Sequence, residues 1–178
     1  MRSNMKKKIL SLLSALLITT FLTSPVSAGP AIKLFGGANN VDWSLGSLVA
    51  GGALIVGNTD VKVILEASGV PVVTCTNQGS NSAPGQNPPN ISATGAQTLL
   101  DRTKNGKSPF DVEASPPETL PGLQGGCPNN TWTAHIDFVF WDQATITVTN
   151  LAGDTIFLVQ NYTCTTTRNP DTVSCTAN

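Results

Sequence analysis

The chain has 178 residues, of which 40% are hydrophobic and 12% carry a charge. Its ten basic and eleven acidic side chains give a formal net charge of −1 at pH 7. This balance argues against a nucleic-acid-binding protein, because that function depends on clustered lysine and arginine side chains.

The first 28 residues are predicted to form a signal peptide. Arg2 and three lysines precede an apolar stretch from Ile9 to Leu22, and Pro25 and the small residues Val26-Ser27-Ala28 follow it. The apolar stretch is shorter than the roughly 20 residues that a helix needs to span a bilayer. We therefore expect cleavage after Ala28 and a secreted, extracellular protein with no membrane segment after cleavage.

Removal of this leader leaves an acidic chain, residues 29–178, whose length suits a single domain. Four of the ten basic residues leave with the leader, so six remain against eleven acidic ones, a net charge of −5. Among these six, only Arg102, Lys104 and Lys107 lie near one another in sequence. We expect no nucleic-acid partner for the exported domain.

Four cysteines in an exported chain predict two disulfide bonds, for which three pairings are open. These residues are Cys75, Cys127, Cys164 and Cys175. The pairs Cys75–Cys127 and Cys164–Cys175 are favoured, because the second closes a local loop and the first then joins two long segments rich in glycine and proline. We expect no metal site, because the cysteines are widely spaced and His135 is the only histidine.

Alternation of apolar and polar residues predicts strands in the first half of the exported chain. A segment at 45–56 is followed by a turn at 57–60 and by a strand that begins at Val61. A further strand is expected at 70–75. The pair Asn105-Gly106 favours a hairpin between residues around 92–103 and 107–114, since both residues tolerate positive φ.

The second half of the chain continues this pattern. The segment 132–140 places these residues on one apolar side: Trp132, Ala134, Ile136, Phe138 and Phe140. A turn at 141–143 is expected to lead to a strand at 144–149, and a turn at 150–154 to a strand at 155–164 that is apolar on both sides. About eight strands and no helical period predict an all-β fold, an antiparallel β-sandwich of immunoglobulin-like architecture with its topology left open.

Two segments are expected to remain irregular. One begins after Cys75 and runs to residue 90, and the other occupies residues 115–130. Their proline and glycine content opposes strand pairing, and each adjoins a cysteine. If Cys75 bonds to Cys127, both loops leave from the same end of the sandwich.

Several short motifs, taken in order, carry a resemblance. They are SLGSLVAGGALIVGNTDVKV at 44–63, CTNQG from Cys75, PGQNP from Pro84, NGK from Asn105 and CPNNTW at 127–132. With these motifs the chain resembles a group of small secreted microbial β-rich proteins of unknown function, over most of its length up to Gln160. The resemblance implies export, a β-rich fold and a bond between Cys75 and Cys127, and it implies no catalytic residue and no cofactor.

His135 is the natural candidate for a general base at neutral pH, and it shares a strand face with Asp137. The sequence contains no serine in a G-x-S-x-G setting. Asp111 and Glu113 also share a face, but a glycosidase needs two carboxyls on opposite sides of a cleft. We therefore predict that the protein is not an enzyme and has no cofactor.

The leading interpretation is a secreted interaction or envelope-associated protein, and the second is a module that binds carbohydrate or cell wall. Trp43 and Trp141 are candidates for exposed rings that stack on sugars. The loop after Cys75 adds amide side chains, which suit a neutral, hydroxyl-rich glycan unless they hydrogen-bond to their own backbone. These candidates are Asn77, Gln78, Asn81, Gln86, Asn87 and Asn90. Another extracellular protein is the alternative partner, and a hydrolase is the third interpretation.

Overall fold

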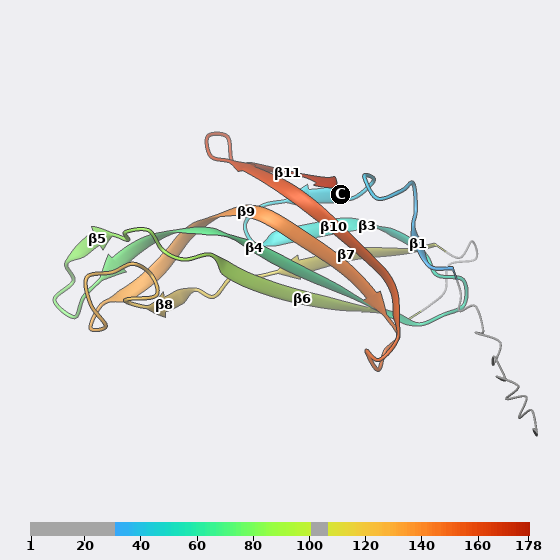
Figure 1. Ribbon diagram of the computed structural model, residues 1–178, viewed down its shortest axis with the longest axis horizontal. Coiled ribbons are helices and arrows are strands. Elements are labelled where there is room, and N and C mark those ends of the chain that lie inside the picture. Colours follow the sequence, from blue (N-terminus) through green and yellow to red (C-terminus); the bar gives the residue numbers. More distant parts are fainter. Residues whose placement is uncertain (1–30, 101–106) are drawn as a thin grey trace, which may run out of the picture.

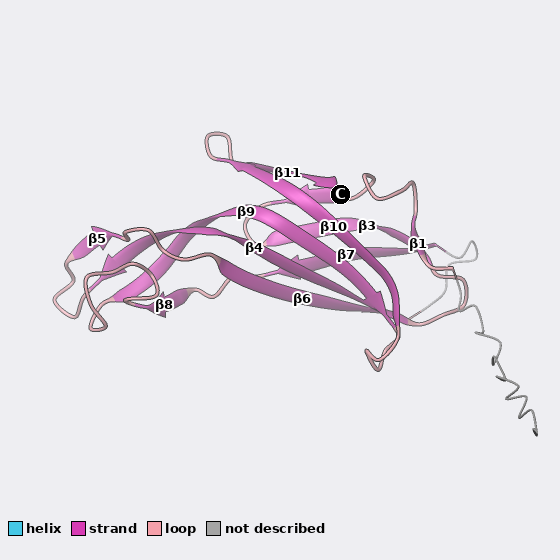
Figure 2. Ribbon diagram, in the orientation of Figure 1, coloured by secondary structure: helices cyan, strands magenta, loops and turns pink. Residues whose placement is uncertain are grey.

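The computed structural model describes residues 31–100 and 107–178, so the predicted leader and the Asn105-Gly106 turn lie outside the described residues. The described chain forms eleven strands, which Figure 2 shows linked by loops. It contains no helix long and apolar enough to cross a membrane. The predicted all-β sandwich is confirmed, with two antiparallel sheets.

The smaller sheet has four strands, with β3 at its centre. It contains β1 (Lys33–Leu34), β2 (Asp42–Ser44), β3 (Leu48–Ile55) and β7 (Lys107–Ala114). β7 pairs with one edge of β3, and β1 and β2 pair with successive parts of the other edge.

The larger sheet has seven strands and is built on two long ones, β4 and β9. It contains β4 (Val61–Thr76), β5 (Ser82–Pro84), β6 (Ile91–Leu99), β8 (Thr119–Pro121), β9 (Thr133–Thr149), β10 (Ile156–Thr167) and β11 (Thr172–Ala177). β4 and β9 pair from Lys62↔Thr149 to Thr76↔Thr133. They extend past the four-stranded sheet toward the end of the molecule that carries β5 and β8 (Figure 1).

The predicted hairpin between residues 92–103 and 107–114 is wrong. β6 pairs with β4, and β7 pairs with β3, so the connection crosses from one sheet to the other. Both strands bury one face in the core between the sheets, and this burial outweighs the local turn signal. The two backbones come so close that a side chain at Gly95 would overlap the carbonyl group of Glu113.

The two segments expected to be irregular are only partly so. The first contains β5, which pairs back onto the end of β4, and the second contains β8, which pairs with the start of β9. Both lie at one end of the molecule, as predicted, and the disulfide Cys75–Cys127 joins them with a Cα–Cα distance of 5.7 Å. Each short strand satisfies backbone groups that proline-rich sequence would otherwise leave to water.

The apolar core has two parts. The larger lies between the two sheets, and its fully buried side chains include Leu48, Leu54, Leu65 and Ile146. The smaller consists of Val73, Cys75, Cys127 and Ala134 at the disulfide end, with Trp132 packed against it. The Cys75–Cys127 bond therefore supplies part of the core where the four-stranded sheet no longer covers β4 and β9.

Tyr162 of β10 connects the two sheets. Its ring is 1% exposed and packs edge-on against Trp43 of β2, with 5.0 Å between ring centroids. Its hydroxyl donates a 3.0 Å hydrogen bond to the carbonyl of Ala38. Burial raises the pKa of Tyr162 to about 12. The second disulfide, Cys164–Cys175, joins facing residues of β10 and β11 beside it.

Tyr162 is the only tyrosine in the chain, so phenolate absorbance reports on this residue alone. We expect the folded protein to show one ionisation near pH 12, against about 10 for an unfolded chain. Because the folded state disfavours the phenolate, the Tyr162 contribution to the free energy of unfolding should decline as pH rises from about 10 to about 12. Absorbance titration, with thermal unfolding of wild type and Tyr162→Phe at each pH, measures both. A phenolate forming near pH 10 in folded protein would contradict the buried position.

Candidate functional site

Two β-bulges in β9 decide which of its side chains face solvent. The ladder with β4 shifts register twice, so that Asp137 and then Asp142 have no residue opposite them. Each extra residue reverses the alternation of inward and outward side chains. The segment 138–141 between the bulges therefore faces the opposite way from the rest of the strand.

Side chains of β4 donate hydrogen bonds to the extra residue of each bulge. Thr74 Oγ1 donates to Asp137 Oδ2 at 2.7 Å, and Ser68 Oγ donates to Asp142 Oδ1 at 3.1 Å. Gly69 lies at the second bulge, where a side chain would overlap the carbonyl of Phe140. Hydrogen bonds from β4 to the extra aspartate of each bulge, together with Gly69 at the second bulge, are thus the local causes of the reversal.

The reversal overturns three sequence expectations about β9. The turn predicted at 141–143 is wrong, because the strand continues through it. Trp141 is only 1% exposed, so it offers no ring to a sugar. Phe138 and Phe140, expected in the core, face outward, whereas Val139 is buried in their place.

The outward residues form an apolar surface, here called the phenylalanine patch, made of Val70, Val72, Phe138 and Phe140. Cross-strand pairing places Val70 opposite Phe140 and Val72 opposite Phe138. The two phenyl rings meet edge to face at 5.1 Å, and Val70 is 41% exposed. The guanidinium of Arg168, from the β10–β11 turn, lies 5.4 Å from the centre of the Phe138 ring.

His135 lies beyond the first bulge and is exposed. Its Nε2 atom is 3.0 Å from Thr76 Oγ1, whereas the Asp137 carboxylate accepts its hydrogen bond from Thr74. The sequence placed His135 and Asp137 on one strand face, but each side chain contacts a different threonine of β4. The arrangement is that of a hydrogen-bonded outer sheet face.

The candidate amides lie on the segment that leaves β4 at the disulfide end, forms β5 and leads to β6. Asn77 Oδ1 accepts hydrogen bonds from the backbone N–H groups of Gly79 and Asn81, at 2.9 and 3.0 Å. Asn77 therefore shapes the turn between β4 and β5. The remaining candidates are exposed: Gln78, Asn81, Gln86, Asn87 and Asn90. The alternative stated from the sequence, that these amides hydrogen-bond to their own backbone, therefore holds for Asn77.

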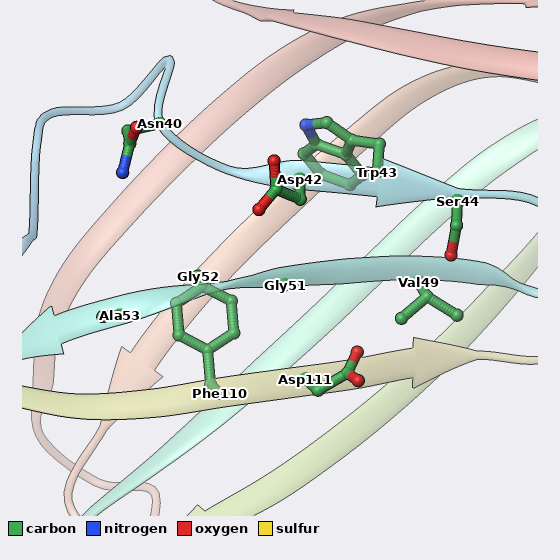
Figure 3. Close-up of a pocket in the computed structure, with 10 residues that line it drawn as sticks. All are labelled: Asn40, Asp42, Trp43, Ser44, Val49, Gly51, Gly52, Ala53, Phe110 and Asp111. Carbon is green, nitrogen blue, oxygen red and sulfur yellow. The ribbon is translucent and has the colours of Figure 1, made fainter.

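Trp43, the other predicted sugar-binding ring, lies in the four-stranded sheet and is half-buried against Tyr162. Beside it a groove of about 540 Å³ crosses the sheet (Figure 3). Asp42 of β2 and Asp111 of β7 pair with Gly51 from opposite sides, so two exposed carboxylates flank a floor without a side chain.

The groove does not resemble the site of a glycosidase. Its two carboxylates are exposed to water, on the open face of a sheet. Glu113 shares the outer face of β7 with Asp111, as predicted. Hydrogen bonds from Ser47 and Ser115 lower the pKa of Glu113 and keep its carboxylate charged.

No family model, curated protein or solved structure matches this chain. Of the surfaces described, the phenylalanine patch is the one that depends on a specific departure from regular strand structure.

The bulges predict opposite responses at adjacent positions of β9. Val139→Lys places a charge in the core and should lower the free energy of unfolding by about 3 kcal/mol or more, whereas Phe140→Lys should cost about 1 kcal/mol. Urea denaturation of the two variants measures the difference. If β9 kept regular alternation, Phe140→Lys would be the damaging change and Val139→Lys the tolerated one.

Proposed function

We propose that the protein is an exported, non-catalytic binding protein that contacts an extracellular partner through the phenylalanine patch. The observation that carries this proposal is that two half-buried phenylalanines lie on the outer face of β9, between two bulges. Exposed, contiguous apolar surface on a soluble domain is a usual sign of an interaction site. The two disulfides are typical of proteins that work outside the cell.

The surroundings of the patch support an interface. Arg168, His135, Asp137 and Asp142 lie around the apolar centre, and aromatic residues with a polar rim are common in protein–protein contacts. The patch lies on the two longest strands, which pair with each other along its whole length. A surface of this kind loses little conformational entropy when it binds.

A neutral glycan is the second candidate partner, and the bulge aspartates favour it. The hydrogen bonds from Thr74 and Ser68 each use one carboxylate oxygen, so the second oxygen of Asp137 and of Asp142 can accept from a sugar hydroxyl. The phenyl rings between these aspartates offer apolar faces to the C–H groups of a sugar. One glycan chain bound along β9 would then contact Asp137, the two phenyl rings and Asp142 in turn.

The experiment compares Phe138→Ser and Phe140→Ser with Phe35→Ser, which removes an exposed phenylalanine from the turn after β1. Binding is measured to purified envelope polysaccharide, to immobilised glycans and to proteins of the cell surface, with circular dichroism as a check of folding. We expect the patch variants to bind roughly tenfold more weakly or worse, and Phe35→Ser to bind as wild type does.

Equal binding by all three variants would contradict the patch as the binding surface. A loss restricted to polysaccharide or glycans would favour the second candidate. A hydrolase activity that disappears in His135→Ala would overturn the non-catalytic part of the proposal.

A further inference from the structure

The outer face of the larger sheet becomes polar beside the phenylalanine patch. Past the second bulge of β9, the strands β6, β4, β9 and β10 lie side by side (Figure 1), and rows of outward side chains cross them. One row contains Ser92, Ser68, Gln143 and Thr163, and the next contains Thr94, Glu66, Thr145 and Asn161. Every side chain in these two rows is polar. The row that follows is largely apolar, with Ala96, Ile64, Thr147 and Val159.

The surface between the two polar rows is hollowed. One hollow, of about 220 Å³, lies over β6, β4 and β9, and a second, of about 350 Å³, lies over β9 and β10. The two hollows share Gln143, Ala144 and Thr145, so they adjoin. Together with the two polar rows they are here called the polar trough. Four strands about 4.8 Å apart give the trough a length of about 14 Å.

Three amide side chains line the second hollow, those of Gln143, Asn161 and Asn178. Thr145 Oγ1 donates a 2.9 Å hydrogen bond to Asn161 Oδ1. Thr163 Oγ1 donates a hydrogen bond of the same length to Asn178 Oδ1. Both bonds use the amide oxygen, so neither occupies the NH₂ group of the asparagine. The threonines thus orient two amides before any ligand binds, which lowers the entropy that binding costs.

The side chains of the trough suit a neutral partner that is rich in hydroxyl groups. Hydroxyl and amide side chains both donate and accept hydrogen bonds, as sugar hydroxyls do. Glu66 is the only charged side chain among the described residues that line the two hollows. Its carboxylate accepts from a hydroxyl group but repels an anion. The trough therefore disfavours phosphate, sulfate and uronate groups, which bind best to arginine or lysine.

The trough adjoins the phenylalanine patch at the second bulge. Ser68 lines the first hollow and also donates its hydrogen bond to Asp142, next to the patch. Gln143 follows Asp142 in β9 and lines both hollows. Phe140 and Gln143 are separated by about 10 Å, the rise of three strand residues. A chain molecule on this face can therefore contact the patch and the trough together.

We propose that the polar trough binds a neutral polysaccharide, and that the bound chain continues from the trough onto the phenylalanine patch. This inference rests on the proposed function and names the class of its partner. In the trough, the amides of Gln143, Asn161 and Asn178 hydrogen-bond to sugar hydroxyls. In the patch, the phenyl rings contact the C–H groups of the sugar. The combined surface offers apolar contact together with a few oriented polar groups, as binding sites for small molecules do.

Isothermal titration calorimetry of the protein without its predicted leader tests the proposal. The probes are soluble oligosaccharides of glucose, mannose, galactose and N-acetylglucosamine, with an oligouronate as the anionic comparison. We expect the wild-type protein to bind at least one of the neutral series, and to bind longer chains more tightly than the monosaccharide. The oligouronate should not bind.

Asn161→Asp tests the trough without altering its shape. Aspartate keeps two acceptor oxygens, so the hydrogen bond from Thr145 is retained, but the NH₂ donors are lost. The affinity for the neutral oligosaccharide should fall roughly tenfold or more, with little change in melting temperature. Asn130→Asp is the matched control, because it makes the same change at an exposed amide in the loop before β9. Its affinity should equal that of the wild type.

Phe138→Ser, measured in the same titration, separates this inference from the proposed function. A loss of affinity in both Phe138→Ser and Asn161→Asp supports one continuous site. A loss in Phe138→Ser alone would overturn the trough and leave the patch as the binding surface. A loss in Asn161→Asp alone would contradict the patch and the continuation of the chain onto it. A wild-type protein that binds none of the neutral oligosaccharides, or that binds the oligouronate equally well, would overturn the inference.

Discussion

The pairing of β4 with β9 is the interaction on which the rest of the structure depends. β5 and β6 attach to β4, β8 and β10 attach to β9, and β11 attaches to β10. One half of the pair forms the floor of the main core, and the other half is closed by the Cys75–Cys127 bond and the loops around it. The β4–β9 ladder thus contributes side chains to both cores. A change in its register would therefore move side chains in both.

Because of the two bulges, the side chains that β9 buries change parity along the strand. In β4 every second residue is buried, without interruption from Val61 to Cys75. β9 buries Ala134 near the disulfide, then Val139 and Trp141, and then Ala144 and Ile146 in the main core. The middle segment places the large indole of Trp141 inside and two phenyl rings outside. The patch and the filled core are therefore two results of the same local geometry.

Sequence patterns predicted the features that depend on local spacing or on a repeating alternation of residues. The alternation in β4, the pairing of the four cysteines and the shared end of the two loops all follow from spacing and composition, and the structure contains them. The direction of residues 138–141 and the partner of β7 could not be derived in the same way, because both depend on which strand lies opposite. One signal was present: residues 136–141 are apolar on both sides of the strand, and an aspartate interrupts them at 137 and follows them at 142.

The register of β4 against β9 in solution is the most direct test of the two bulges in β9. Nuclear Overhauser contacts between assigned backbone protons would measure it, since facing residues of antiparallel strands lie close together. We expect contacts of Ser68 with Gln143 and of Gly69 with Trp141, with Asp142 left without a facing residue. Contacts of Gly69 with Asp142 and of Val70 with Trp141 would show regular alternation, an exposed indole and a buried Phe140, and would contradict the account.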